Sequence, residues 1–418
     1  MNDLFESEYQ DQYWLISRDA KGKIRCIDLN YTKEGDGYVI HRTSFQYQGK
    51  RTKQPDITIT SGKVKRDIHA QTILKFESLA KEYKDKGYKE INKDPDSIPE
   101  EQLLEVVGEV ATNQAGIIKP MLAKQESKVT KRSILDKEWM CSMKLDGVRC
   151  LMYWNGSEVL TASRGGEDYN IATTHIREYE PLVNFFKKNP TIILDGELYK
   201  HFPKKTLQQI SGAARMEKNA YDCDWLEYWV YDCYSKEDPN VSAEDRFTFL
   251  RGDFDDIAHF VHIDIDGKLD IHDGCEGSPL YLLNQEYIST ENSIWEFHDE
   301  CVNLGFEGCV IRDPDKPYKP NGRTNSMIKF KNYKSADFIV IDYELGARGS
   351  EDMVFICRMP GGRTFKAMPV GDRNVKEEYV QNFETKYKGH LAEVTYFNYS
   401  DEGIPTQPKL RIFRFDLE

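Results

Sequence analysis

The stretch 337–399 constrains the fold most, because it contains four short strand-like runs in close succession. The runs are DFIVIDYEL, MVFICRM, RTFKAMPV and HLAEVTYFNY, each rich in β-branched and aromatic residues. Between the third and fourth runs, apolar residues recur at helical spacing: Val375, Tyr379, Phe383 and Tyr387. The stretch therefore predicts a small barrel of about five strands, with a helix between strands three and four.

A five-stranded barrel with this helix placement is the oligonucleotide-binding (OB) arrangement. Other small β domains give the same sequence pattern, so the pattern alone leaves them open. The chain ahead of the barrel changes character twice. Residues 13–60 are β-rich and are followed by the helical stretch HAQTILKFESLAKEYKDKGY, which Gly87 ends.

A mixed region separates the two β-rich parts. Strand-like runs such as TIILDGELY and YWVYDCY alternate there with helical stretches such as SIWEFHDECVNLG. The sequence thus predicts an α+β chain of four parts. They are a small β-rich domain with a helix at 1–92, a linker with a short helix at 93–118, a mixed domain at 119–333 and the barrel at 334–418.

The charge of the chain is unevenly distributed. The 418 residues carry a net charge of −13, which taken alone argues against a nucleic-acid partner. Residues 1–92, however, carry 17 Lys and Arg against 14 Asp and Glu, a net of +3, and the remainder has a net of −16. Binding to nucleic acid depends on local basic surfaces, so the acidic total does not exclude it.

The cysteines and the apolar runs indicate the compartment. Nine cysteines are scattered without a CxxC pair, and an odd number suits neither a disulfide framework nor a four-cysteine zinc site. We expect free thiols in a reducing, intracellular compartment. No apolar run approaches the length of a membrane span, and the acidic start MNDLFESEYQ lacks the apolar core of a signal peptide.

The segment CSMKLDGVRC is the first candidate for chemistry. A lysine amine is protonated at neutral pH and becomes a nucleophile where burial or neighbouring cations lower its pKa. Lys144 has Arg149 five residues on as a candidate cation. A lone KxDG also occurs in ordinary surface turns, so this segment decides nothing without the rest of the chain.

Further candidates follow in order along the mixed region. Asp195 and Glu197 are two apart on a predicted strand, so they share a face, and the same spacing holds for Lys329 and Lys331. The other candidates are Arg164 in SRGG, Tyr231 in YWVYDCY and Glu307 in EGCVIR.

Each of these residues alone has a plain structural reading, as a rim charge, a core aromatic or a solvated strand face. Together they match the needs of nucleotidyl transfer. That reaction requires a nucleophile, cations for phosphates, hard oxygen ligands for Mg²⁺ and a flat surface for a base.

The series PMLAK, KLDGVR, SRGG, LDGELY, YWVYDCY, EGCVIR and IKFK resembles the ordered motifs of ATP-dependent DNA ligases. This family belongs to the covalent nucleotidyltransferases, and the resemblance covers roughly residues 119–418. It implies an ATP-grasp-like nucleotidyltransferase domain followed by an OB-fold barrel. It also implies ATP and Mg²⁺ as cofactors and nicked double-stranded DNA as the substrate. We expect a monomer that has no membrane association, and an acidic chain of this size would suit a viral or phage enzyme.

The resemblance also assigns roles to the candidate residues. Lys144 would carry AMP, Tyr231 would stack on adenine and Glu307 would bind metal. Glu197 would contact the ribose or a metal. The cations that would contact the ribose or the phosphates are Arg149, Arg164, Lys329, Lys331 and, in the C-terminal motif, Arg414.

Two positions depart from the family pattern. Many members have an acidic residue two positions before the lysine, where this chain has Ser142, so the way adenine is read is open. The C-terminal motif often ends in an Asp-Lys pair, whereas here PKLRIFRFDLE ends in Leu417 and Glu418. The group that orients the leaving pyrophosphate is therefore open too.

Residues 1–92 resemble, more weakly, the WGR domains that contact DNA in some repair enzymes, through GYVIHRTSFQYQGK and the helix that follows it. The Trp-Gly-Arg signature itself is absent, and only Arg42 remains of it. A purely structural β-plus-helix module is an equal alternative for this region.

The sequence therefore predicts a nick-sealing DNA ligase that uses ATP. The alternatives are an RNA ligase, a capping-type nucleotidyltransferase and a non-catalytic DNA-binding scaffold. The intact set of Lys144, Glu197 and Glu307 disfavours the scaffold. An NAD-dependent ligase is disfavoured by the missing zinc cysteines.

Overall fold

The computed structural model describes residues 11–19, 22–62, 66–108, 110–129, 137–218, 220–272, 275–346, 349–400 and 402–415. The chain falls into two compact units, Met1–Phe330 and Lys331–Glu418. Every helix within the described ranges is too short or too polar to cross a membrane.

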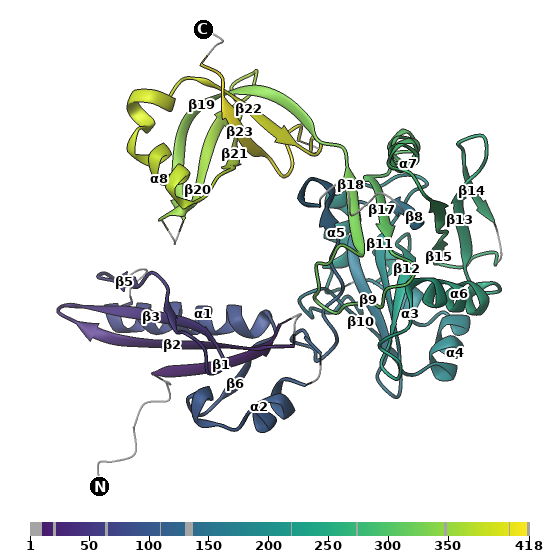
Figure 1. Ribbon diagram of the computed structural model, residues 1–418, viewed down its shortest axis with the longest axis horizontal. Helices are drawn as coiled ribbons and strands as arrows, with labels where there is room; N and C mark the ends of the chain where they lie inside the picture. The colour runs from purple at the N-terminus through teal and green to yellow at the C-terminus, as the bar shows by residue number, and fades with distance from the viewer. Residues whose placement is uncertain are drawn as a thin grey trace. The chain divides into compact units, whose positions relative to one another are not determined.

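The first unit begins with a six-stranded sheet (Figure 1). Its strands are β1 (Gln12–Arg18), β2 (Ile24–Glu34), β3 (Gly37–Gln46), β4 (Thr52–Lys53), β5 (Ile57–Ile59) and β6 (Lys89–Ile91). The strand order is β4-β3-β2-β1-β6, and β5 also pairs with β3. Two helices accompany this sheet, α1 (Ile68–Asp85) and α2 (Glu100–Val107).

The two helices cover opposite faces of this sheet because successive side chains of a strand point to opposite sides. Leu15 of β1 packs in one buried cluster with Phe76 of α1. The next residue, Ile16, packs in a second cluster with Leu103 of α2. The short helix predicted between residues 93 and 118 is therefore present, and it completes the core of the N-terminal sheet.

The remainder of the first unit contains two further sheets. The seven-stranded sheet consists, in spatial order, of β10 (Val159–Ala162), β9 (Val148–Trp154), β11 (Ile192–Tyr199), β12 (Glu227–Ser235), β15 (Leu280–Leu283), β13 (His259–Ile263) and β14 (Leu269–His272). The five-stranded sheet consists of β16 (Glu286–Ile288), β8 (Trp139–Lys144), β17 (Gly308–Arg312), β18 (Met327–Lys331) and β7 (Lys124–Gln125).

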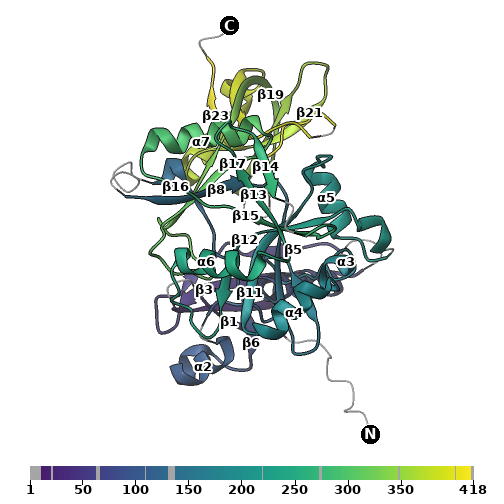
Figure 2. The same ribbon diagram turned by 90° about the vertical axis from the view of Figure 1, so that its right-hand side faces the viewer.

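Helices pack on both of these sheets (Figures 1 and 2). They are α3 (Thr174–Arg177), α4 (Glu180–Lys188), α5 (Leu207–Ala214), α6 (Ala243–Phe254) and α7 (Glu291–Asn303). One continuous core unites them, with Phe186 of α4, Phe254 of α6 and Trp229 of β12 fully buried in it. The central strands read as nearly continuous apolar runs because both of their faces are covered.

The second unit is a closed five-stranded barrel in the order β19-β20-β21-β23-β22. Its strands are β19 (Lys334–Gly346), β20 (Gly349–Arg358), β21 (Thr364–Pro369), β22 (Leu391–Tyr396) and β23 (Lys409–Phe413). The predicted helix lies between strands three and four but divides in two. Helix α8 (Arg373–Gln381) is followed by a π-helical turn at Phe383–Tyr387, and only the turn buries its aromatic residues in the barrel core.

The predicted α+β fold class is thus confirmed, with a β-rich region first and an OB-type barrel last. The fifth barrel strand comes from PKLRIFRF, a segment that its sequence marks only as a motif.

Candidate functional site

A cavity of about 100 Å³ in the first unit is lined by residues of both the seven-stranded and the five-stranded sheet. The lining residues are Ala123, Ser142, Met143, Lys144, Leu145, Arg149, Glu197, Tyr231, Val310, Arg312 and Met327. Four of the residues predicted from the sequence lie here together, although they are spread over almost 90 positions of the chain. The fold therefore assembles the middle of the predicted set around one cavity.

Lys144 is the last residue of β8, and its ammonium group is held in place on two sides. Nζ forms an ion pair with the carboxylate of Glu307 and donates a hydrogen bond of 3.1 Å to the carbonyl of Leu145. The backbone N–H of Glu307 donates to the carbonyl of Lys144 at 2.8 Å, because β17 pairs with β8 from the next residue onward. Glu307 itself is only 3% exposed, so the lysine of the cavity has a buried acid as its partner.

Arg149 of β9 is fixed by a buried carboxylate. It donates from Nε to Oδ1 of Asp195 at 2.8 Å and from its terminal nitrogen to the other oxygen. The hydroxyl of Tyr318 donates to the same carboxylate at 2.6 Å. Asp195, which sequence spacing placed beside Glu197, is therefore engaged in holding Arg149.

Glu197 lies directly opposite Arg149 in the pairing of β11 with β9. Burial raises the pKa of its carboxyl, while Lys144 and Arg149 pull that pKa down and Asp146 pushes it up; the net direction is upward. This side chain is therefore a partly buried acid whose pKa responds to two cations, in a position where a hard cation or a ribose hydroxyl would also satisfy it.

Tyr231 owes its position to a β-bulge in β12. Asp232 pairs with Asp195 and Val230 pairs with Gly196, so Tyr231 is the extra residue between them. Its neighbours in the strand are buried, whereas Tyr231 is partly exposed in the cavity. The guanidinium carbons of Arg149 and Arg312 lie 5.7 and 5.5 Å from its ring centre. The bulge thus turns one ring of an otherwise buried strand toward the cavity.

Sequence reasoning missed the network behind Tyr231. Buried Arg312 donates a 3.0 Å hydrogen bond to the hydroxyl of Ser142, and its Nε lies 3.6 Å from the carboxylate of Asp232. Arg246 holds the same carboxylate with bonds of 2.7 and 3.1 Å. The only signal in the sequence was the arginine at the end of EGCVIR.

The other predicted residues do not line this cavity. Arg164 lies on an exposed turn after β10, and partial burial together with the cations Arg323 and Arg149 lowers its pKa. Lys329 is half-buried in β18. Lys331 and Arg414 belong to the second unit. There Lys331 lies over the ring of Phe397, and Arg414 forms ion pairs with Glu393 at 2.7 Å and Asp337 at 3.4 Å.

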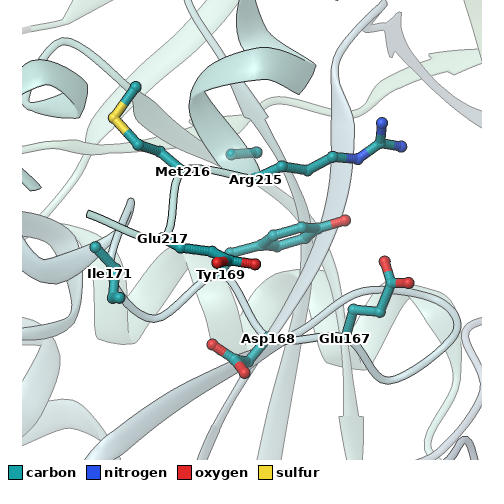
Figure 3. Close-up of a pocket in the computed structure, with 8 residues that line it drawn as sticks. Glu167, Asp168, Tyr169, Ile171, Arg215, Met216 and Glu217 are labelled. Carbon is teal, nitrogen blue, oxygen red and sulfur yellow. The ribbon is translucent and has the colours of Figure 1, made fainter. Parts of the chain in front are cut away.

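A larger cavity of about 520 Å³ lies elsewhere in the first unit (Figure 3). Its charged lining consists of three carboxylates and one guanidinium, from Glu167, Asp168, Glu217 and Arg215. None of the predicted site residues lines it. An acidic lining of this kind repels phosphates, so the smaller cavity around Lys144 is the better candidate for nucleotide chemistry.

Comparison with known proteins identifies the family. The family model described as ATP dependent DNA ligase domain matches residues 120–331. A DNA ligase of African swine fever virus is 25% identical over 318 residues, covering 73% of this chain and 70% of the viral protein. A DNA ligase of Haemophilus influenzae is 25% identical over 218 residues, covering 52% of this chain and 66% of that protein.

Solved structures share the fold. The structure named Pmar-Lig_Pre. has a TM-score of 0.57 at 18% identity and covers 78% of this chain and 72% of its own. A structure of the Lig E DNA ligases has a TM-score of 0.51 at 16% identity and covers 71% of this chain and 100% of its own. The family match lies outside residues 1–92, so the WGR resemblance of that region gains no support. The chain belongs to the ATP-dependent DNA ligase family, and its activity is ATP-dependent DNA ligation.

Proposed function

We propose that this DNA ligase seals nicks in double-stranded DNA and that Lys144 is its nucleophile. The observation that carries the proposal is the placement of Lys144. Its amine lies in a cavity lined by Arg149, Glu197 and Tyr231, and it is held by Glu307. A surface lysine in a chance turn would have neither the buried acid partner nor the aromatic and cationic walls.

The first step joins the enzyme to AMP. Lys144 Nζ, after losing a proton and separating from Glu307, attacks the α-phosphorus of ATP. An N–P bond forms, the bond to the bridging oxygen breaks, and pyrophosphate leaves. The fixed position of the lysine favours this attack because the strand that carries it is paired on both sides, with β16 and β17.

The two later steps transfer AMP and seal the nick. An oxygen of the 5′-phosphate attacks the phosphorus of the lysine-bound AMP, which releases Lys144 and activates the DNA end. The 3′-hydroxyl then attacks that end, a phosphodiester bond forms, and AMP departs with the bonding electrons. AMP is needed because it turns a poor leaving oxygen into a good one.

Other side chains would bind the nucleotide. Tyr231 presents a ring face for adenine, and Arg149 is aimed by Asp195 so that it can contact the ribose or phosphates. Arg164, Lys329, Lys331 and Arg414 would add positive charge for binding the nucleotide.

The donor set around Lys144 fits Mg²⁺. Glu197 and Glu307 supply carboxylate oxygens, the ligands that this hard cation prefers. Bound there, Mg²⁺ would offset negative charge between approaching phosphates. The raised pKa of Glu197 supports this assignment because a buried carboxylate is stabilised in its charged form by an added cation.

We further propose nicked DNA as the substrate, as this chemistry requires. A monomer as the active form and an intracellular location complete the proposal. The proposed parts of the chain remain 1–92, 93–118, 119–333 and 334–418, except that α2 packs on the N-terminal sheet.

A nick-sealing assay tests the function. A duplex with one labelled 5′-phosphate at a nick is incubated with the protein, Mg²⁺ and ATP, GTP or NAD in parallel. We expect sealing with ATP alone and on a DNA nick in preference to a nicked RNA duplex. Sealing that requires GTP, or that proceeds only on RNA, would contradict the proposal.

A further inference from the structure

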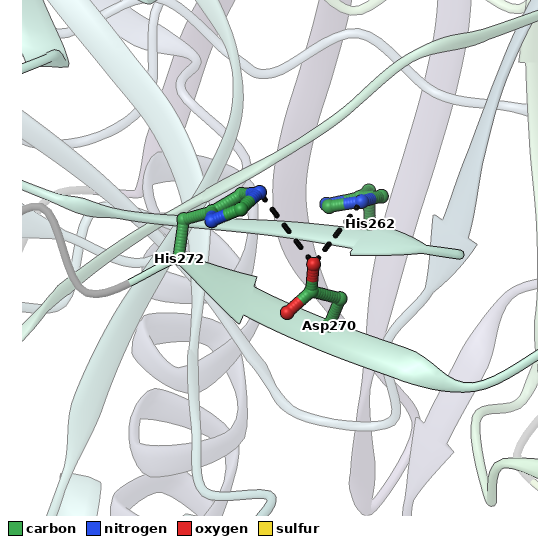
Figure 4. A group of neighbouring side chains, drawn as sticks. All are labelled: His262, Asp270 and His272. Atoms are coloured by element: carbon green, nitrogen blue, oxygen red, sulfur yellow. Dashed lines mark ion pairs between the residues drawn. The ribbon is translucent and has the colours of Figure 1, made fainter.

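The hairpin of β13 and β14 carries three possible metal ligands on one face. His262 of β13 lies directly opposite Asp270 of β14, and His272 is two residues further along β14. Cross-strand partners share a face, and so do residues two apart on a strand. Figure 4 shows the two imidazole rings flanking the carboxylate of Asp270.

The separations of the donor atoms suit a shared cation. Nε2 of His262 and Nε2 of His272 each lie 3.5 Å from Oδ2 of Asp270, and one ligand atom from each residue lies within 4.8 Å of the others. These distances exceed a normal hydrogen bond. They are close to the spacing of about 3.3 Å between ligand atoms around a tetrahedral ion with bonds of 2.0–2.1 Å.

The orientation of the rings supports the same reading. The two imidazoles are stacked, with centres 5.3 Å apart and planes inclined by 20°, so both present Nε2 to the same carboxylate. The side chains are 27%, 42% and 69% exposed for His262, Asp270 and His272, which leaves the group open to an ion from solution.

We propose that His262, Asp270 and His272 bind a divalent transition-metal ion, with Zn²⁺ as the first choice. Imidazole ligands favour zinc and its neighbours in the first transition row, whereas Mg²⁺ prefers sites built from oxygen. Three protein ligands leave a fourth position for water. The competing reading, two histidines that share one surface carboxylate as ion pairs, predicts no such binding.

The place of this hairpin in the fold assigns the ion a structural role. Strand β14 is the last strand of the seven-stranded sheet and, among the described residues, pairs only with β13. An ion held by both strands would tie this edge strand to the sheet. Strands β15 and β13 lie between β14 and β12, which carries Tyr231. The site is therefore at the edge of the seven-stranded sheet, and β15 separates its nearer strand, β13, from the strand that lines the ligase cavity.

Calorimetric titration with Zn²⁺, in buffer that already contains saturating Mg²⁺, tests the proposal. We expect His262→Ala and His272→Ala each to weaken binding of one Zn²⁺ equivalent by at least about tenfold. His41→Ala is the matched control, since His41 lies beside the carboxylates of Asp56 at 3.0 Å and Glu34 at 3.9 Å. The control variant should bind Zn²⁺ like the wild type.

Two further readouts separate this site from the thiols and from the ligase chemistry. Co²⁺ bound here should give a visible spectrum without a thiolate charge-transfer band, which would instead report a cysteine such as Cys275. Zn²⁺ should raise the melting temperature of the wild type but not of His262→Ala. Formation of lysine-bound AMP with Mg²⁺ should be the same in both proteins. The zinc proposal can therefore fail without affecting the ligase assignment. Equal Zn²⁺ affinity in the wild type and both histidine variants, or no Zn²⁺ binding by the wild type, would overturn the proposal.

Discussion

Ser142 stands where members of this family often carry an acid, and its surroundings show what the change does to the cavity. The serine hydroxyl accepts a hydrogen bond from Arg312 without neutralising its charge. The carboxylate near Arg312, that of Asp232, is shared with Arg246. Two guanidinium groups thus depend on one carboxylate, and the wall beside Tyr231 keeps a positive character that an acid at position 142 would remove.

We predict that Ser142→Ala destabilises the protein. The change leaves a buried guanidinium N–H of Arg312 without its acceptor, which costs about 1–3 kcal/mol. Urea denaturation measures the free energy of unfolding. Ser157→Ala, in an exposed turn where the hydroxyl bonds Asn155, is the control and should change the free energy by less than about 0.5 kcal/mol. Equal effects of the two substitutions would contradict the role given to Ser142.

We predict a pH-dependent gain in stability for Glu197→Gln. Burial raises the pKa of Glu197 in the folded protein. An acid with a raised folded pKa contributes stability below its unfolded pKa, near 4.5, and loses that contribution as pH rises through the folded pKa. The glutamine variant cannot ionise, so its melting temperature should exceed that of the wild type at pH 7, and the difference should shrink as pH falls toward 4.5.

The activity of the same variant should move in the opposite direction. Loss of the carboxylate removes a proposed ligand of Mg²⁺, so formation of lysine-bound AMP should fall at every pH. A variant that is less stable than the wild type at pH 7 would contradict the partly buried, charge-disfavouring environment of Glu197.

At the scale of elements, the bulge in β12 has the largest effect on the site. In a regular strand the side chains alternate strictly between the two faces, so Tyr231 and Asp232 could not both keep their present positions. Either the ring of Tyr231 would be buried, or the carboxylate of Asp232, which orients Arg246 and Arg312, would leave the core. One irregular position in the strand therefore sets both the aromatic wall and the arginine network.

We predict that Tyr231→Ala weakens ATP binding by a factor of roughly 10 to 100. Stacking of a base on an aromatic ring contributes about 1–3 kcal/mol when measured by alanine substitution. Tyr231→Phe is the control because, within the described ranges, the tyrosine hydroxyl makes one long bond of 3.4 Å, to the carbonyl of Gly196. Equilibrium binding of labelled ATP distinguishes the two variants. A loss as large for phenylalanine as for alanine would show that the hydroxyl, and not the ring face, binds the nucleotide.

The sequence predicted the elements whose residues form a strong local pattern, either β-rich runs or helical spacing with a cap. The runs MVFICRM and RTFKAMPV became β20 and β21, and the helical stretch after residue 67 became α1, where Asp67 caps the first turn. The bulge could not be predicted because YWVYDCY has aromatic residues on both faces, so its periodicity does not say which ring points outward.

The candidate site was predicted only in part for a similar physical reason. The order of the motifs along the chain predicted Lys144, Arg149 and Glu197 as site residues. The bonds from Arg312 to Ser142 and from Tyr318 to Asp195, however, join residues 170 and 123 positions apart. Such contacts depend on which distant segments the fold places side by side, as where β17 pairs with β8, and no local pattern encodes them. The docking of α2 on the N-terminal sheet was missed for the same reason.

At the scale of the whole molecule, the separation of charge is the feature that bears on DNA. Residues 1–92 have a net charge of +3 in a chain whose total is −13. A protein that neutralises phosphates releases counterions, so its affinity for DNA falls with rising salt in proportion to the phosphates contacted. The N-terminal region is therefore a candidate DNA contact on charge alone, whatever family it belongs to.

We predict that removal of residues 1–107 weakens binding to nicked DNA and flattens its salt dependence. The cut includes α2 because Leu103 and Val107 pack on the N-terminal sheet and would otherwise be exposed. Fluorescence anisotropy of a labelled nick at several salt concentrations gives the slope. Its magnitude should decrease by about 0.9 for each phosphate that the shortened protein no longer neutralises. Unchanged affinity and slope would assign the region a purely structural role.

The most direct test of the proposed chemistry is the covalent labelling of Lys144. The protein is incubated with Mg²⁺ and ATP labelled at the α-phosphate, and the bound label is measured after denaturation. The control is Lys137→Ala. Lys137 forms an ion pair with Asp313, and neither residue lines the cavity. The wild type and this control should both carry the label. Lys144→Ala should carry none, and label retained by Lys144→Ala would contradict the central claim.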